Sequence, residues 1–174
     1  MALIVHKYGG TSMGSPERIR NVAKRVAKWA RAGHQMVVVP SAMSGETNRL
    51  RGLASELAPS QAKSSYYREL DMLAATGEQA SSALLAIALQ AEGMEAVSYT
   101  GWQVPVRTDS SFTKARIESI DDERVRKDLN AGRVVVITGF QGIDPEGHIT
   151  TLGRGGSDTS AVAIAAALKA NECL

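Results

Sequence analysis

Short apolar runs alternate along the chain with longer segments in which apolar residues recur every three or four positions. Residues 2–7, 36–40 and 134–138 are mostly apolar and include several valines and isoleucines, which is typical of strands buried on both faces of a sheet. Residues 16–31 begin with a proline and carry apolar side chains at helical spacing, with arginines and lysines between them. This pattern predicts buried strands that alternate with amphipathic helices.

The alternation extends along the rest of the chain. We expect further helices over residues 49–57, 66–75, 78–91, 120–130 and 161–170, and further strands over residues 96–100, 104–108 and 112–120. Thr76 and Gly77 predict a break between two helices, which places Glu78 in the first turn of the second one. Residues 144–147 have the composition of a hairpin turn. Repeated β-α units predict an α/β fold, a three-layer sandwich with a mostly parallel sheet between helices.

Length and composition narrow the class of protein. The chain has 174 residues, of which 44% are apolar and 22% charged, with a net charge of +2, which favours one globular domain. The low net charge gives no indication of a nucleic acid or membrane partner. The uninterrupted apolar runs are too short to span a bilayer, and residues 1–15 lack the layout of a signal peptide. The single cysteine, Cys173, suits a reducing compartment, so we expect a cytoplasmic protein.

The chain ends at residues 171–174, directly after the last predicted helix. An α/β unit usually returns its helix to another strand of the sheet. We therefore expect the fold to be truncated at its C-terminus, just before that strand.

The glycine-rich segment 151–160 runs directly into the last predicted helix. Gly153, Gly155 and Gly156 let the backbone turn sharply and leave room for a ligand to approach the amide groups. The first N–H groups of the helix and the positive end of its dipole suit a phosphate or a carboxylate. The segment therefore predicts an anion site.

Polar side chains of the same segment add to this site. Arg154 offers a planar fork that can hold a carboxylate at two points, and Ser157 or Asp158 can cap the helix. The alternative is an ordinary turn from strand to helix with a polar cap. The spacing alone leaves both interpretations open.

Three other loops follow buried strands. They begin at Lys7, Ser41 and Gly139, and the carboxyl ends of parallel strands are where open α/β sheets bind ligands. The loop at residues 41–48 can line a polar pocket with its hydroxyl groups or merely cap the next helix. Glu78 has two interpretations, a favourable charge at a helix N-terminus or a carboxylate that binds a ligand ammonium group. We expect the three loops to meet at one sheet edge, together with residues 153–157.

Several kinds of site are disfavoured by the sequence. The three histidines and Cys173 show no metal-ligand spacing, no G-x-S-x-G elbow surrounds a serine, and no G-x-G-x-x-G follows the first strand. What remains is an anion site with a lysine, an arginine, hydroxyl groups, glycine amides and two acids. Phosphoryl transfer needs such a site, because its catalysis is mainly positioning and charge neutralisation.

Five segments in order resemble the signatures of aspartate kinases, within the amino acid kinase superfamily. They are residues 7–14 (KYGGTSMG), 41–48 (SAMSGETN), 76–78 (TGE), 138–142 (TGFQG) and 153–158 (GRGGSD). The resemblance runs from residue 3 to the end of the chain. It implies transfer of the γ-phosphoryl group of ATP to the side-chain carboxylate of L-aspartate, with Mg²⁺ on the nucleotide.

The resemblance also implies roles for individual residues. Lys7 is expected to neutralise the transferring phosphoryl group, and Asp158 to hold Lys7 in position. The implied phosphate-binding residues are Lys7, Gly9, Gly10, Gly155 and Gly156. The implied aspartate-binding residues are Ser41, Thr47, Glu78 on the ammonium group, Arg154 on a carboxylate, Ser157, and Phe140 as a wall. No residue is assigned to a resident metal.

The family pattern continues beyond the last helix of this chain. It implies that residues 1–174 are the N-terminal, aspartate-binding part of a catalytic domain, without the nucleotide-binding C-terminal part or the regulatory ACT domains. Such a chain is expected to bind ATP poorly and turn over little by itself, and the full-length protein to form a homo-oligomer. Two alternatives are an amino acid kinase that acts on glutamate or carbamate, and a non-catalytic amino-acid-binding or assembly module.

Overall fold

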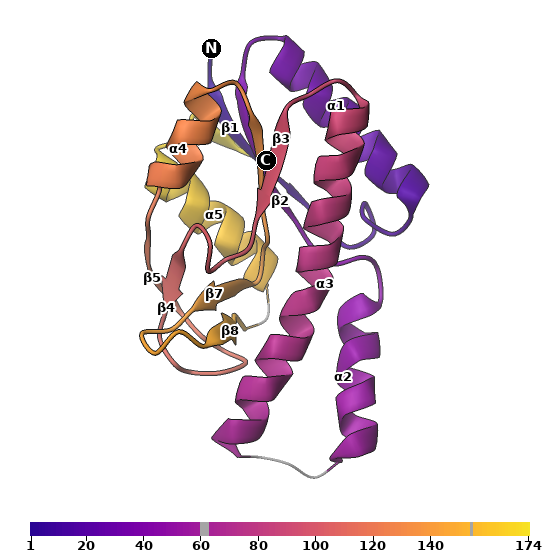
Figure 1. Ribbon diagram of the computed structural model, residues 1–174, viewed down its shortest axis with the longest axis vertical. Coiled ribbons are helices and arrows are strands. Elements are labelled where there is room, and N and C mark those ends of the chain that lie inside the picture. The colour runs from indigo at the N-terminus through magenta and orange to yellow at the C-terminus, as the bar shows by residue number, and fades with distance from the viewer. Residues whose placement is uncertain (60–62, 154) are drawn as a thin grey trace.

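A five-stranded, fully parallel sheet forms the centre of the protein (Figure 1). The computed structural model describes residues 1–59, 63–153 and 155–174. In spatial order the strands are β3 (Ala96–Tyr99), β6 (Val134–Ile137), β2 (Gln35–Pro40), β1 (Leu3–Tyr8) and β9 (Glu172–Cys173). Three of them, β1, β2 and β6, correspond to the apolar runs of the sequence, and β3 corresponds to the strand predicted over residues 96–100.

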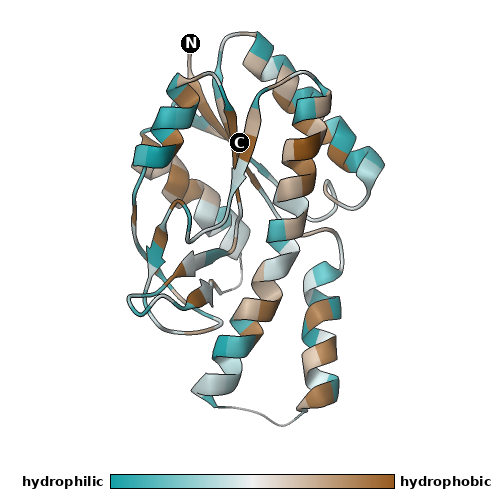
Figure 2. Cartoon of the chain, in the orientation of Figure 1, coloured by the Kyte–Doolittle hydropathy of each residue, from teal (hydrophilic) through white to brown (hydrophobic). Residues whose placement is uncertain are grey.

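Helices cover both faces of this sheet and form the predicted three-layer sandwich. Helices α1 (Pro16–Arg31) and α3 (Ser64–Ala91) pack on one face, and α4 (Glu123–Asn130) and α5 (Gly156–Leu168) on the other. Val38 of β2 faces the α1 side, whereas Val37 and Val39 face the α5 side. This burial on both faces is the physical reason why the strands are apolar without alternation. Figure 2 shows hydrophobic residues along these strands and many hydrophilic ones on α1 and α4.

A second, smaller sheet adjoins the first. Its order is β5 (Ile117–Ile120), β4 (Val106–Thr108), β7 (Gln141–Ile143) and β8 (Ile149–Thr151). Strands β7 and β8 form the predicted hairpin, with Ile143 opposite Ile149. The predicted strand over residues 112–120 is too long, since β5 begins only at Ile117. Before it, the chain forms a loop in which the Asp109 carboxylate accepts hydrogen bonds from the Ser111 and Arg116 amides.

Helix α3 is continuous, so the predicted break at Thr76 and Gly77 is wrong. The Thr76 hydroxyl donates to the Leu73 carbonyl at 2.7 Å, which satisfies this side chain within the helix. Gly77 faces Ala42, and a Cβ at Gly77 would lie 3.0 Å from the Ala42 Cβ. The glycine serves close packing against the loop after β2 and does not end the helix. Glu78 consequently lies in the middle of α3.

The continuous α3 is longer than any apolar segment that the sequence analysis considered for a membrane span. By length and composition alone it is able to cross a membrane, with a mean hydropathy of 1.3 over its most apolar window. Half of that window is buried inside the protein. Leu85 and Leu89 of α3 belong to the same core cluster as Ile4 and Val38 of the central sheet. This packing is that of a core helix in a globular domain.

Helices α2 (Glu46–Leu57) and α5 begin several residues earlier than the sequence predicts. Helix α2 starts after Gly45 and α5 starts after Gly155, and both glycines have positive φ, +79° and +76°. Neither start is capped by a side chain, so the predicted cap by Ser157 or Asp158 is wrong. Left-handed glycines let the chain turn into each helix without a cap. In α5 this places Ser157 and Asp158 within the first turn.

The last residues of the chain also differ from expectation. Glu172 and Cys173 form β9, a two-residue strand that pairs in parallel with Ile4 and Val5 of β1. The chain therefore returns from α5 to the central sheet, and the prediction that it ends before the next strand is wrong. The Leu174 amide also donates to the Val5 carbonyl.

Candidate active site

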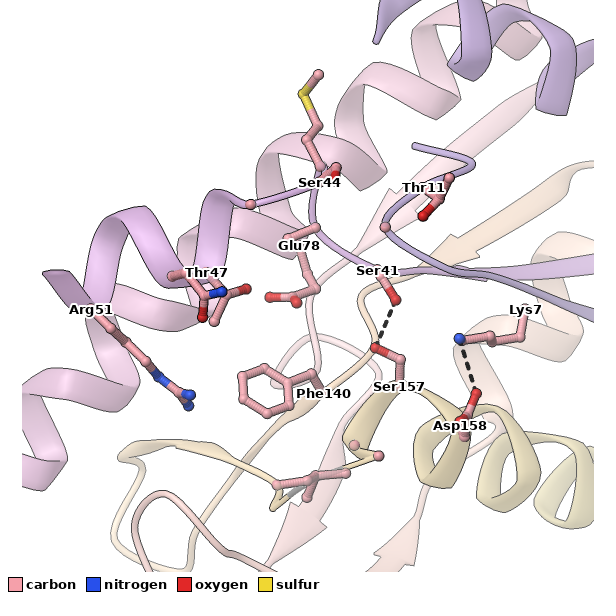
Figure 3. A pocket seen from close by; sticks show the side chains of 18 of the residues that line it. Lys7, Thr11, Ser41, Ser44, Thr47, Arg51, Glu78, Phe140, Ser157 and Asp158 are labelled. Carbon is pink, nitrogen blue, oxygen red and sulfur yellow. Dashed lines mark hydrogen bonds and ion pairs between the residues drawn. The ribbon is translucent and has the colours of Figure 1, made fainter. Parts of the chain in front are cut away.

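The three predicted loops meet at the carboxyl ends of β1, β2 and β6, as expected. There they line a cavity of about 610 Å³ together with the glycine-rich loop before α5 (Figure 3). Its walls include Lys7, Gly10, Thr11, Ser41, Thr47, Arg51, Glu78, Phe140, Gly155, Gly156, Ser157 and Asp158. Residues far apart in sequence thus form one polar site.

Lys7 and Asp158 form an ion pair at one end of this cavity. The Lys7 Nζ lies 3.0 Å from Asp158 Oδ1, and the side chains are 26% and 71% exposed. Lys7 lies near the end of β1 and Asp158 in the first turn of α5. A Cβ at Gly9 would lie 3.5 Å from Lys7 Nζ, an ordinary contact distance, so Gly9 adjoins this ammonium group. The partly exposed lysine can bind phosphate oxygens while Asp158 holds it in place.

The N-terminus of α5 opens on the same end of the cavity. The first amides of a helix lack intrahelical acceptors and suit an anion. Gly156 is required for packing, because a Cβ there would approach Phe140 Cδ1 to 2.5 Å. Ser157, which does not cap α5, instead accepts a hydrogen bond at 3.0 Å from the Ser41 hydroxyl. This bond connects the loop after β2 to the first turn of α5.

Glu78 is the buried acid of the site. It is 3% exposed, and its Oε2 has no hydrogen-bond partner in the part of the chain that the structure describes. Burial raises its pKa from 4.5 to about 7, although backbone amides and Arg51 favour the charged form. Its place in the middle of α3 removes the interpretation as a charge at a helix N-terminus. A buried carboxylate oxygen that faces a cavity suits a ligand that donates hydrogen bonds, such as an ammonium group.

Phe140 and Thr47 line the cavity near Glu78. Phe140 has a φ of +74°, which is unusual for a side chain of this size, and its amide donates to Ser160 Oγ at 2.9 Å. That hydrogen bond to α5 supports the conformation that turns the ring toward the cavity (Figure 3). Thr47 lies in the first turn of α2.

Arg51 is a residue of the site that the sequence analysis missed. It lines the cavity, and its Cζ lies 5.9 Å from the centroid of the Phe140 ring. The signal was its position four residues after Thr47, which puts both on one face of α2. Because the sequence predicted α2 only from residue 49, Thr47 and Arg51 were not placed on one helix.

Asp71 is a second residue that the sequence analysis missed. It is 1% exposed and accepts hydrogen bonds from the Thr151 amide and hydroxyl, at 2.8 and 2.7 Å, and from the Thr113 amide. Burial is the main cause that raises its pKa, and these hydrogen bonds oppose the shift. Asp71 lies seven residues before Glu78 on the same face of α3, a spacing that the predicted break at Thr76 concealed. It connects α3 to the strand that leads into the glycine-rich loop.

Two remaining expectations concern Arg154 and metal binding. Arg154 lies outside the described residues, so its function as a carboxylate clamp stays a prediction. Within residues 1–59, 63–153 and 155–174, no three His, Cys, Asp or Glu side chains come together as a potential metal site.

Comparison with known proteins finds relatives that match nearly the whole chain. The chain is 62% identical over 173 residues to an aspartate kinase of Pseudomonas fluorescens, and the match covers 99% of this chain and 41% of that protein. An aspartate kinase from Synechocystis superimposes with a TM-score of 0.79 at 48% identity, covering 99% of this chain and 28% of that one.

The E. coli aspartokinase III in complex with aspartate and ADP superimposes with a TM-score of 0.83 at 25% identity, covering 98% of this chain and 48% of that one. The chain thus spans less than half the length of these relatives. The family model for the amino acid kinase family matches residues 2–174. With its parallel sheet, its glycine-rich loops and this match along nearly its whole length, the chain belongs to the amino acid kinase family.

Proposed function

We propose that this chain is the aspartate-binding part of an aspartate kinase, which transfers the γ-phosphoryl group of ATP to the side-chain carboxylate of L-aspartate and forms 4-phospho-L-aspartate. The observation that carries the proposal is a single cavity with Lys7 at one end and the buried Glu78 in its wall. A cation for a phosphoryl group and a carboxylate for an ammonium group suit an amino acid that is phosphorylated. The relatives named aspartate kinase support the choice of aspartate.

The cavity offers a partner for each polar group of aspartate. Glu78 accepts hydrogen bonds from the substrate ammonium group. We expect Arg154, which lies outside the described residues, to hold a carboxylate at two points. The hydroxyl groups of Ser41, Thr47 and Ser157 complete the pocket, and the Phe140 ring forms one wall. The remaining carboxylate is thereby directed toward Lys7.

The transfer itself requires no general base. A side-chain carboxylate of aspartate is ionised at neutral pH and attacks the γ-phosphorus directly. The new P–O bond forms as the bond to the bridging oxygen breaks, and ADP leaves with that electron pair. Lys7, held by Asp158, and the amides of Gly9, Gly10, Gly155 and Gly156 stabilise the charge on the phosphoryl oxygens. We expect ATP to bind as its Mg²⁺ complex, in which the metal ion neutralises the phosphates.

We propose that the complete enzyme is longer than this chain. We assign the nucleotide-binding C-terminal part and the regulatory ACT domains to the remaining length, since this chain covers 41% of its Pseudomonas relative. We further propose that the full-length protein is a homo-oligomer and lies in the cytoplasm. An exposed free cysteine such as Cys173 suits a reducing compartment.

Calorimetric titration tests the proposal. The 174-residue chain and the full-length protein are each titrated with L-aspartate and with Mg-ATP, and the full-length protein is assayed for turnover with aspartate, glutamate and carbamate. We expect the chain to bind aspartate and the full-length protein to phosphorylate only aspartate. Turnover of glutamate or carbamate in its place indicates another amino acid kinase. Aspartate binding without turnover by the full-length protein indicates a non-catalytic module.

A further inference from the structure

Two buried charged groups in the cavity wall each have an atom without a hydrogen-bond partner. Among the described residues, five buried side-chain atoms lack a partner, and only two of them belong to charged groups, Glu78 Oε2 and Arg51 Nε. Both residues line the cavity of the candidate active site, whereas the other three atoms are hydroxyl oxygens of residues outside it. An unsatisfied buried polar atom is unfavourable, and more so on a charged group. The cavity therefore holds one acceptor and one donor that a bound ligand can satisfy.

The two groups do not satisfy each other. Within residues 1–59, 63–153 and 155–174, no ion pair joins Arg51 to Glu78 or to another acid. The Arg51 guanidinium group instead lies over the Phe140 ring, with its Cζ 5.9 Å from the ring centroid. A guanidinium group on an aromatic face still has its N–H groups available at its edge, where they suit a carboxylate.

Arg49 shows how another arginine of α2 is satisfied without a ligand. It binds the Glu46 carboxylate through two nitrogens, at 3.0 and 2.7 Å, and its side chain is 60% exposed. Arg51 lies two residues further along the helix and therefore on a different face. It points toward the cavity on the same side as Thr47 (Figure 3). Arg51 is thus placed to bind a ligand, whereas Arg49 is placed at the surface.

The order of the charges along the cavity matches the groups of L-aspartate. Figure 3 shows Lys7 and Asp158 at one end and Arg51 at the other, with Glu78 and Phe140 between them. L-aspartate carries its ammonium group and its α-carboxylate on the same carbon, and its reactive carboxylate beyond a methylene group. With the ammonium group on Glu78, an α-carboxylate on Arg51 leaves the side-chain carboxylate directed toward Lys7.

We propose that Arg51 is a substrate-binding residue that donates hydrogen bonds to the α-carboxylate of L-aspartate and thereby orients the side-chain carboxylate toward Lys7. This role rests on the proposed function for the identity of the substrate. A carboxylate accepts up to about four hydrogen bonds, so the α-carboxylate can bind Arg154 as well. Glu78 and Arg51 together recognise an α-amino acid, and Arg51 discriminates against amines that lack the α-carboxylate.

The test compares L-aspartate with β-alanine, which keeps the ammonium group and the reactive carboxylate but lacks the α-carboxylate. The Kd of each ligand is measured for the full-length wild type, Arg51→Gln and the matched control Arg49→Gln, with β-alanine measured in competition with aspartate. Loss of hydrogen bonds to a charged group predicts about tenfold to a hundredfold weaker aspartate binding in Arg51→Gln. We expect Arg51→Gln to bind β-alanine as the wild type does, and Arg49→Gln to leave both Kd values unchanged.

A milder variant guards against a loss of folding. Arg51→Lys keeps the charge but not the planar fork, so we expect it to weaken aspartate binding by a smaller factor and again to leave β-alanine binding unchanged. An equal loss for both ligands, or aspartate binding as tight as in the wild type, overturns the assignment of Arg51. Failure of the proposed function is a separate result, in which the wild type neither binds nor phosphorylates aspartate.

Discussion

Two carboxylates of the site have opposite environments. Glu78 is 3% exposed and its pKa is raised to about 7, whereas the Asp158 side chain is 71% exposed and paired with Lys7. Burial penalises the charged form of the first, and water together with a lysine stabilises the charge of the second. The two residues therefore differ in what they contribute to stability and to function.

Glu78→Gln is expected to stabilise the fold more as the pH rises. The folded-state pKa of about 7 lies above the ordinary glutamate value of 4.5, so the folded protein retains a proton that the unfolded chain releases. The stability that this proton provides is complete below pH 4.5 and is lost as the pH rises through about 7. At 1.36 kcal/mol per unit the difference amounts to about 3 kcal/mol. Urea unfolding of both proteins near pH 5 and pH 8 checks this, and parallel pH profiles would contradict it.

Lys7→Met is expected to affect phosphoryl transfer far more than stability. Asp158 of the Lys7–Asp158 pair is exposed and Lys7 is partly exposed, and pairs in contact with solvent contribute about 0–1 kcal/mol to folding. Loss of charge stabilisation in the transition state costs about a hundredfold or more in kcat. Steady-state assays and urea unfolding of the full-length variant measure both quantities, with Lys24→Met on the exposed face of α1 as the control. Near-normal turnover in Lys7→Met would remove Lys7 from the proposed mechanism.

At the scale of elements, the course of α3 is decided by packing. A glycine within a helix usually lowers its stability by about 1 kcal/mol relative to alanine. For this reason the sequence predicted a helix end at Gly77. Gly77 instead lies where α3 packs closely against Ala42 of the loop after β2. The cost in helix propensity is offset by the close contact that positions this loop at the cavity.

Two helical glycines therefore respond differently to alanine. Gly52 of α2 has open space around its missing Cβ, so Gly52→Ala is expected to stabilise the protein by about 0.5–1 kcal/mol. Gly77→Ala places a Cβ 3.0 Å from the Ala42 Cβ, so no such gain is expected. Displacement of the loop after β2 weakens aspartate binding in this variant alone. Thermal unfolding and aspartate titration of both variants are the measurements, and an equal gain in stability with unchanged binding would exclude this function of Gly77.

At the scale of the whole molecule, α3 connects the two sheets. Its C-terminal half packs Leu85 and Leu89 against the central sheet, and Asp71 near its start binds Thr151 of β8. Gln141 of β7 adds a side-chain hydrogen bond at 3.0 Å to the Ala75 carbonyl. One helix thus positions the small sheet relative to the large one, and with it the glycine-rich loop.

Asp71→Ala is expected to destabilise the protein by about 2–4 kcal/mol, because it leaves the buried donors of Thr151 and the partly buried Thr113 amide without this acceptor. Aspartate binding is expected to weaken as well, since Thr113 lines the cavity. Asp109→Ala is the control, because that carboxylate makes similar but exposed hydrogen bonds nearby. Urea unfolding with aspartate titration tests this, and similar losses in both variants would contradict it.

Much of the fold and of the site followed from local pattern. The valine-rich runs predicted β2 and β6, and proline with regular apolar spacing predicted α1. Because parallel strands present their carboxyl ends at one edge, the meeting of the loops after β1, β2 and β6 was also predictable. Arg51 and Asp71 were not, because their helix faces became apparent only once α2 and α3 had their full lengths.

The sequence by itself determined which segments are strands and helices and which polar residues follow them, because periodicity and turn chemistry act over a few neighbouring residues. Only the tertiary structure decided that α3 passes through Thr76 and Gly77, that Glu78 is buried and that Arg51 lines the same cavity. These features depend on contacts between segments far apart in the chain. Burial and charge proximity are properties of such contacts, and no local pattern specifies them.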